Sequence, residues 1–357
     1  MPVKDGNVDG HKLTDLVVRA FTEVGLPNED ARLTATMLVR TDLRGVDSHG
    51  VARLASYYIR ALKDGRINSN PKTEVISQAP ATAVVEGDRG LGFVVGNQAM
   101  NEAIRRAETA GAGFVSVRNS THFGAAFNYA MIALEHDMIG ISMTDSIMDV
   151  VPPGSNKPGI GTNPIAVAAP AAKRAHFILD MATSVVAAGK LQIARWEGKP
   201  IPEGWAIDGE GKPLTEPDKW VRGEGGLLPL GGTPDLRSFK GFGLATVVEI
   251  LSALLSGSPA TLLRQTSPEA RSGSNHFFGA FKIASFLPLE DFRNSMDDMI
   301  EAFGALPRLP GVEKVYVAGE YEAEIERERR VSGIPLHSSV VASLKTMSEE
   351  LGIEYDL

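Results

Sequence analysis

Two histidines and one arginine are the residues of this sequence best suited to moving a proton and binding an anion. Ser48 and His49 are adjacent, and Arg53 and Tyr57 follow four and eight residues after His49. Serine commonly caps helices, and at 3.6 residues per turn this spacing aligns the other three side chains on one face. Histidine transfers protons near neutral pH, and a guanidinium can bind a carboxylate through two hydrogen bonds. The segment therefore predicts an acid–base group beside an anion ligand; a capped helix with an incidental histidine is the alternative.

The second histidine, His122, lies in a polar turn between a predicted strand and a predicted helix. Ligand-binding groups often occupy such turns in α/β proteins. The small residues Gly124, Ala125 and Ala126 follow, and a helix that begins with small residues leaves its N–H groups accessible to a phosphate. The turn predicts a second proton-transfer group near a phosphate-bearing ligand. A helix cap with a core histidine is the alternative.

Four further polar segments end predicted strands or begin predicted helices. They supply hydrogen-bonding side chains and glycines that allow close backbone approach. These segments are 144–146, 159–164, 180–184 and 240–243. In the last of them, Lys240 precedes two glycines, which suggests a contact with a phosphate. No single segment specifies a reaction, but together they predict a proton-transfer enzyme for a small anionic molecule.

The composition and the missing motifs exclude several other kinds of chemistry. The 357 residues include no cysteine, which excludes disulfides, thiolate nucleophiles and cysteine-ligated zinc. The net charge of −8, without a basic run, argues against nucleic acid as a partner. The sequence contains no G-x-G-x-x-G, phosphate loop, G-x-S-x-G or H-E-x-x-H motif, so neither a Rossmann site nor a metal site is expected.

The sequence also predicts a cytoplasmic protein without a membrane partner. We find no apolar stretch approaching the roughly 18 residues that span a bilayer. Residues 1–6 contain no apolar signal region.

The hydrophobic pattern predicts an α/β protein in which strands and helices alternate from about residue 80 to 195. The first predicted helix is capped by Asp9 or Thr14 and ends before Gly25. The other predicted helices cover 28–43, 51–63, 96–110, 125–136, 241–256, 320–330 and 339–351. The predicted strands cover 73–76, 81–86, 114–117, 139–143, 165–169, 176–180, 279–286 and 315–317. Residues 198–240 are rich in glycine, proline and charge, which predicts a long surface excursion near a site.

Taken together, the polar segments resemble those of the malate/L-lactate dehydrogenase family. That family includes ureidoglycolate dehydrogenase, 2,3-diketogulonate reductase, sulfolactate dehydrogenase and piperideine-2-carboxylate reductase. The resemblance is carried, in the family's order and over nearly the whole chain, by residues 44–50, 119–124, 161–164, 180–184, 240–244 and 333–336. It implies an oxidoreductase that transfers hydride between NAD or NADP and a small 2-oxo or 2-hydroxy acid.

The resemblance also implies a fold and an assembly. The expected fold is α/β, with a non-Rossmann mixed-sheet domain that binds nicotinamide and a helical domain built from both chain ends. The corresponding ranges are 1–75 for the N-terminal helical part, 76–327 for the mixed-sheet domain and 328–357 for the C-terminal helical part. A homodimer is implied as well.

Residue roles follow from the same resemblance. Ser48 and His49 are implied to be a catalytic pair, Arg53 a ligand of the substrate carboxylate, and Ser146 and Thr162 neighbours of the substrate. His122 is implied to donate and accept the proton or to contact the cofactor. The implied cofactor contacts are His122, Phe123, Gly124, Ala125, Ala126, Asp180, Met181, Ala182, Lys240, Gly319 and Glu320.

Several choices stay open at this point. We favour His49 for proton transfer because it shares a predicted face with Arg53. Lys190 replaces an acidic residue of some relatives, so a serine–histidine–carboxylate relay through that position is not expected. The alternatives are a cyclic imino acid reductase of the same family, a 2-oxo acid lyase or isomerase, and a non-catalytic binding protein. The substrate and the choice between NAD and NADP are not determined.

Overall fold

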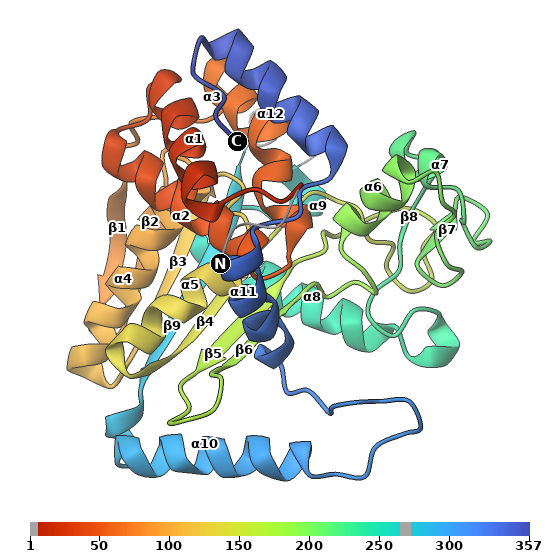
Figure 1. Cartoon of the computed structure of the whole chain (residues 1–357). Coiled ribbons are helices and arrows are strands. Elements are labelled where there is room, and N and C mark those ends of the chain that lie inside the picture. The colour runs from red at the N-terminus through yellow and green to blue at the C-terminus, as the bar shows by residue number, and fades with distance from the viewer. Residues whose placement is uncertain (1–5, 265–272) are drawn as a thin grey trace.

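A seven-stranded mixed sheet forms the centre of the computed structural model, which describes residues 6–264 and 273–357. Its strands are β1 (Glu74–Ala79), β2 (Thr82–Glu86), β3 (Ala112–Ser120), β4 (Met138–Thr144), β5 (Ile165–Ala169), β6 (Phe177–Met181) and β9 (Ser274–Lys282). Their order is β1–β2–β3–β9–β4–β5–β6 (Figure 1), and only β2 and β3 run parallel. This order confirms the predicted non-Rossmann fold. Residues 1–5, part of the segment considered above for a signal region, lie outside the described ranges.

Helices cover both faces of the sheet. The crossover helix α4 (Gly92–Ala110) packs on β3 and β9, and the apolar helix α8 (Phe239–Ser252) packs on the other face of the same strands and β4. Adjacent side chains of β9 lie on opposite faces of the sheet. Phe278 belongs to the main core, and Phe277 belongs to the small core below α8. Gly113 permits close packing of α4, because a Cβ there would lie 2.0 Å from the carbonyl oxygen of Ala103.

Both chain ends contribute to one helical part, as predicted. It contains α1 (Gly10–Glu23), α2 (Asn28–Leu43), α3 (Arg60–Lys63), α11 (Glu320–Ser332) and α12 (Ser338–Leu351). Val8 and Ile334 exchange two backbone hydrogen bonds of 2.9 and 2.8 Å, which hold the ends together. Asp9 caps α1 by accepting from the N–H groups of His11 and Lys12. The domain boundaries near residues 75 and 327 stay a prediction.

A side lobe beside the sheet contains most of the segment expected to be an irregular excursion. We use this name for α6 (Ala188–Trp196), β7 (Ala206–Asp208), α7 (Pro217–Val221) and β8 (Gly225–Leu227), which lie together in Figure 1. Leu191, Ile201, Leu214 and Leu227 are buried in a small core that also includes Val150, Ile160 and Ala245 from outside the lobe. The high glycine and proline content therefore marks turns between short elements rather than an unstructured loop.

Several predicted elements differ from the structure. Residues 315–317 form no strand; the neighbouring Ala318 makes a single backbone bond to Ile178 of β6. The strand expected over 279–286 begins at Ser274 and ends at Lys282. The helix expected over 125–136 is divided into α5 (Phe127–Ala130) and a 3-10 turn. Among the described residues, four helices have no counterpart in the predicted ranges: α6, α7, α9 (Thr261–Arg264) and α10 (Leu289–Gly304), and α10 has only one buried residue.

The expectation that no apolar stretch approaches membrane-spanning length was wrong. The helical segment Phe239–Ser256, which includes α8, has 18 residues and a mean hydropathy of 1.5. Within it, Glu249 is buried and accepts hydrogen bonds from Asn163 and Thr261, and Ala245 and Val248 pack into the protein. These contacts are those of a helix that packs on a sheet, so length and composition alone are weak evidence for a membrane span.

Candidate active site

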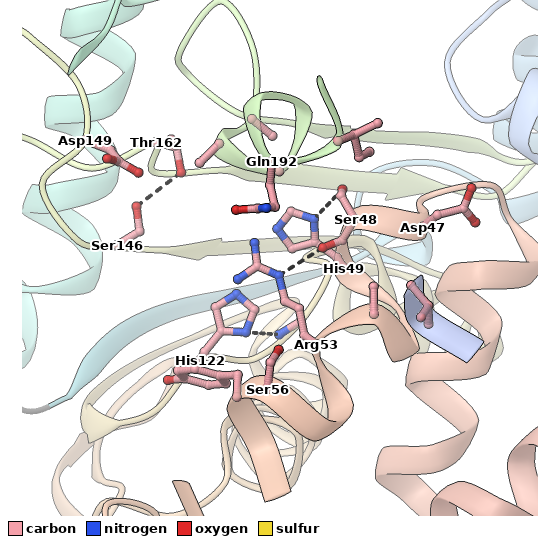
Figure 2. Close-up of a pocket in the computed structure, with 18 of the residues that line it drawn as sticks. Asp47, Ser48, His49, Arg53, Ser56, His122, Ser146, Asp149, Thr162 and Gln192 are labelled. Atoms are coloured by element: carbon pink, nitrogen blue, oxygen red, sulfur yellow. Dashed lines mark hydrogen bonds between the residues drawn. The ribbon is translucent and has the colours of Figure 1, made fainter. Parts of the chain in front are cut away.

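A cavity of about 940 Å³ lies where the sheet, the terminal helices and the side lobe meet. Its walls include seven residues predicted from the sequence to act in catalysis, substrate binding or cofactor binding. They are Ser48, His49, Arg53, His122, Gly124, Ser146 and Thr162. Figure 2 labels all of these except Gly124. The fold therefore brings together side chains that are separated by more than one hundred residues in the sequence.

An irregular segment carries the first group of these residues. It consists of two 3-10 turns (Asp47–His49 and Val51–Arg53) and a π-helical turn (Leu54–Ile59), where one helix over 51–63 was expected. The cause lies at Asp42, whose buried carboxylate accepts a hydrogen bond of 2.8 Å from the Val51 N–H. A Cβ at Gly50 would lie 1.9 Å from the Asp42 carboxylate, so the chain passes directly over that group. A regular α-helix resumes only at Arg60.

Ser48 does not cap a helix, contrary to the prediction. Its hydroxyl lies 3.0 Å from His49 Nδ1, and its carbonyl accepts a 2.9 Å hydrogen bond from Arg53 Nε. This bond leaves the two terminal nitrogens of the Arg53 guanidinium directed into the cavity (Figure 2). The predicted grouping of His49, Arg53 and Tyr57 is therefore present, although irregular turns produce it.

The two histidines lie side by side. Their ring centroids are 5.9 Å apart and the ring planes differ by 19°. His122 Nδ1 lies 2.6 Å from the hydroxyl of Tyr58 and 3.3 Å from the N–H of Gly124. Burial, followed by the charge of Arg53, lowers the pKa of His49 to about 3 and that of His122 well below its usual value. Both rings are therefore neutral at pH 7 before an anion binds.

His49→Gln should make protein stability less sensitive to acid. Unfolded His49 takes up a proton near pH 6.5, whereas the folded form stays neutral down to about pH 3, so the unfolded state binds more protons between these values. The free energy of unfolding therefore falls as the pH falls, by about 1.4 kcal/mol per pH unit for each such group. Urea unfolding at pH 4–6.5 should show a slope smaller by about that amount in the variant. Equal slopes would mean that folded His49 binds the proton.

Polar groups at the ends of β4 and the following loops form the opposite wall. The hydroxyls of Ser146 and Thr162 are 3.2 Å apart, and Asn163 accepts a 3.0 Å hydrogen bond from the Ser146 N–H. Asn163 in turn donates to the buried carboxylate of Glu249 at 3.2 Å. This chain of bonds holds Ser146 and Thr162 toward the cavity, as Figure 2 shows.

Helix α6 closes the cavity from the side lobe and was not predicted to line it. Gly189 lies against Ser48, because a Cβ at this glycine would be 2.7 Å from the serine Cβ. Gln192, one turn further, extends toward His49 and Arg53 (Figure 2). The sequence does not reveal that Gly189 of α6 contacts Ser48, because about 140 residues separate the two.

Asp149 is a second lining residue that sequence reasoning missed. Burial raises the pKa of its carboxyl to about 6, although a hydrogen bond with Trp220 and the charge of Arg53 oppose this rise. Both Asp149 and Trp220 line the cavity. In the sequence, Asp149 is a single aspartate before two valines, and this pattern does not indicate a site residue.

The residues predicted to bind cofactor surround the end of β6. Asp180 accepts a 2.8 Å hydrogen bond from the Phe127 N–H, which joins β6 to the helix that follows the His122 turn. Gly319, with φ +94°, lies against β6, since a Cβ there would be 2.8 Å from the Ile178 nitrogen. The segments around 122–127, 180–182 and 319 are therefore neighbours, as a shared ligand would require.

Two backbone contacts connect Gly241, the neighbour of Lys240, to the segment that follows β6. The Thr183 carbonyl accepts from Leu230 at 2.9 Å, and the Leu230 carbonyl accepts from Gly241 at 3.2 Å. Lys240 is exposed at the start of α8, and within the described residues its ammonium group makes no ion pair. An ammonium group and backbone N–H groups can donate to phosphates, and a carboxylate can accept from hydroxyls, so these groups around one strand end fit a dinucleotide.

Two of the predicted cofactor contacts have other partners in the structure. Phe123 is 1% exposed and stacks on Tyr129 and His276, with centroids 4.7 Å away in both cases. Glu320 accepts from the Val317 N–H and pairs with Lys314. Ala125 and Ala126 are buried as well. At 123, 125 and 126 only backbone atoms are therefore suitably placed to meet a ligand. Among the described residues, no three His, Cys, Asp or Glu side chains converge as metal ligands do.

Several known proteins similar to this chain are dehydrogenases. A family model for malate/L-lactate dehydrogenase matches residues 8–345. A malate dehydrogenase of Pyrococcus horikoshii is 43% identical over 96% of this chain and 95% of its own length. An L-sulfolactate dehydrogenase of Methanocaldococcus jannaschii is 38% identical over 96% of both chains. The crystal structure of malate dehydrogenase from Entamoeba histolytica superimposes with a TM-score of 0.94 at 32% identity, covering 98% of this chain and 99% of that chain.

Proposed function

The chain belongs to the malate/L-lactate dehydrogenase family, and from this premise we propose how its cavity performs the reaction. The family and the relatives establish a 2-hydroxy acid dehydrogenase that uses NAD or NADP. The cyclic imino acid reductase is not favoured, and the lyase and binding-protein alternatives give way to the dehydrogenase. The proposed reaction reduces a 2-oxo acid to a 2-hydroxy acid with one hydride and one proton.

The proposal rests on one observation: the free end of the Arg53 guanidinium and the His122 ring share one cavity. Arg53 holds the substrate carboxylate, which places the neighbouring 2-oxo group beside the histidines. When bound, the nicotinamide supplies or accepts the hydride. Around the end of β6, Asp180, Met181, Ala182 and Lys240 would hold this cofactor.

Within this proposal the geometry supports His122, rather than the initially favoured His49, as the proton-transfer group. Two separate groups hold His122 Nδ1, so the ring orientation is restrained and its other nitrogen is directed into the cavity. Within the described residues, the hydrogen bond of the His49 ring is the one with the adjacent Ser48 hydroxyl. We assign His49 and Ser48 to the substrate contact next to Arg53, and Ser146 and Thr162 to the opposite wall of the substrate site.

A screen of 2-oxo acids tests the function directly. Purified protein should oxidise NADH or NADPH with oxaloacetate, pyruvate or sulfopyruvate, and the ratio of kcat/KM values identifies the preferred acid and cofactor. Cofactor binding without turnover of any acid would favour a binding protein. Turnover of an acid without cofactor would favour a lyase or isomerase.

Lys240→Ala should weaken cofactor binding, and the loss should be greatest at low ionic strength. The lysine is proposed to meet a phosphate, and salt screens such an exposed pair. Fluorescence titration of NADH and NADPH at 20 and 300 mM salt measures the effect, with exposed Lys12→Ala as the control. Equal dissociation constants for wild type and Lys240→Ala at both salt concentrations would remove Lys240 from the site.

A cytoplasmic homodimer is the proposed assembly, with the exposed face of α8 as its contact surface. Leu244, Val247 and Ile250 are each 39–46% exposed and recur every three residues along the helix. A second copy of this chain is the proposed occupant, because water-exposed apolar faces of this kind are typical of subunit contacts. The double variant Val247→Asp, Ile250→Asp should sediment as a monomer, whereas wild type sediments at twice the mass of one chain. A monomeric wild type contradicts the proposal.

A further inference from the structure

We propose that Tyr58 is a positioning residue that allows His122 to hold and release a proton during the reaction. This inference rests on the proposed proton-transfer role of His122. Tyr58 was absent from the residues predicted from the sequence, and it does not line the cavity. It acts through the side of the imidazole that faces away from the substrate.

The position of Tyr58 is fixed by its surroundings. Its side chain is 0% exposed, and its ring makes an edge contact with Phe93 at 5.3 Å and a tilted contact with Phe21 at 6.5 Å. The hydroxyl lies 2.6 Å from His122 Nδ1. The π-helical turn at 54–59 places Tyr58 below His122 while its neighbour Tyr57 lines the cavity.

The contacts define where the neutral ring carries its proton. The Gly124 N–H can only donate, and it is directed at His122 Nδ1 at 3.3 Å. Nδ1 is therefore an acceptor in the resting enzyme, and the Tyr58 hydroxyl donates to it as well. The single proton of the neutral ring lies on Nε2, the nitrogen that faces the cavity.

Proton transfer requires a different arrangement at Nδ1. In the reductive direction the Nε2–H bond breaks and an O–H bond forms at the substrate oxygen; a bound nicotinamide would supply the hydride for the new C–H bond. The neutral ring must therefore first take up a second proton from solvent, so that both nitrogens are protonated, and it finishes with the proton on Nδ1. During this step Nδ1–H needs an acceptor. The Gly124 N–H cannot accept, but a hydroxyl can rotate from donor to acceptor.

The other groups around His122 do not supply this acceptor. Arg53 and His49 approach from the 47–53 segment, His276 from β9, and Tyr57 from the π-helical turn. None of these is a carboxylate, and the Tyr57 hydroxyl is hydrogen-bonded to the backbone of His122 instead of its ring. Both Arg53 and the other histidines disfavour a positive charge on the ring. The Tyr58 hydroxyl is therefore the group within reach that can stabilise the proton-carrying form.

Tyr58→Phe tests the inference through the pH dependence of turnover. Loss of a hydrogen bond to a charged group corresponds to about 1–2 pH units, so the inflection in kcat for 2-oxo acid reduction should move down by that amount. At pH 8 and saturating cofactor, kcat should fall at least about tenfold, and the cofactor dissociation constant should not change. An unmoved inflection overturns the proposal.

Tyr129→Phe is the matched control. Tyr129 is also 0% exposed, and its hydroxyl donates to the Phe123 carbonyl of the same turn at 2.5 Å. This variant removes an equally buried hydroxyl and should lower stability, but it should leave the inflection unchanged. A shift of the same size in both variants would mean that Tyr58 acts only by supporting the fold of the turn.

Two further measurements separate this inference from the proposed function. If His122→Gln retains wild-type turnover, the proposed function of His122 fails. If His122→Gln is inactive but Tyr58→Phe keeps the wild-type inflection, only the role of Tyr58 fails. Should Tyr58→Phe not fold, ¹⁵N-histidine NMR of the wild type reads the tautomer, with His122→Gln identifying the signal. A proton on Nδ1 of the resting neutral ring would overturn the assignment.

Discussion

His122→Gln should lower kcat by about 10²–10⁴-fold, the usual cost of losing a general acid–base group. The glutamine amide can hydrogen-bond to the substrate oxygen but cannot transfer a proton at neutral pH. The inflection assigned to this residue should also disappear from the profile of kcat against pH. The measurement is 2-oxo acid reduction at saturating cofactor between pH 5 and 9.

His49→Gln is the comparison for this prediction, because the two rings stack at 5.9 Å and both line the cavity. It should raise the KM of the 2-oxo acid and keep the inflection. If His49→Gln abolishes the inflection and His122→Gln keeps it, the roles of the two histidines are exchanged. If both variants keep wild-type turnover and the same profile, a histidine mechanism is wrong.

Arg53→Lys should raise the KM of the 2-oxo acid by roughly 10- to 100-fold while cofactor affinity stays unchanged. Lysine keeps the charge, but it cannot make two parallel hydrogen bonds to a carboxylate or the bond that Arg53 Nε donates to Ser48. One lost charge-assisted hydrogen bond is worth about 1.5–3 kcal/mol, which corresponds to this range. Initial rates against substrate concentration measure it.

Arg60→Lys supplies the control, because this arginine is on the same segment but its side chain is 75% exposed and outside the cavity lining. Its kinetic constants should equal those of the wild type. A KM for Arg53→Lys within twofold of the wild-type value would assign Arg53 to the fold instead of the substrate.

Much of the cavity was predictable because polar segments at the ends of apolar helices and strands are visible in a sequence. The segments at 48–53, 119–124, 144–146 and 159–164 stand out against apolar neighbours, and they do line the cavity. The fold class and its helical part followed from the resemblance of these segments to a family. Local spacing and motif order were sufficient for both conclusions.

The rest of the site depends on contacts between distant residues, and spacing does not reveal these. Asp42 prevents a regular helix after Gly50 only because the chain returns across its carboxylate, which explains the wrong prediction for 51–63. In the sequence, Tyr58 has the pattern of an aromatic residue in the core. Its contact with His122 through the hydroxyl becomes visible only in the structure. Helix α6 reaches the cavity through Gly189, whose small size matters only where Ser48 lies opposite.

The position of β9 in the sheet has a consequence for how the protein is made. β9 lies between β3 and β4, although it is translated more than one hundred residues after either of them. Until residue 282 has left the ribosome, both strands have an unpaired edge that can associate with other chains. The helical part is completed later still, because Val8 pairs with Ile334, which is translated after β9. We therefore expect the sheet to assemble only after most of the chain is synthesised, and chains truncated before residue 274 to aggregate instead of forming a smaller domain.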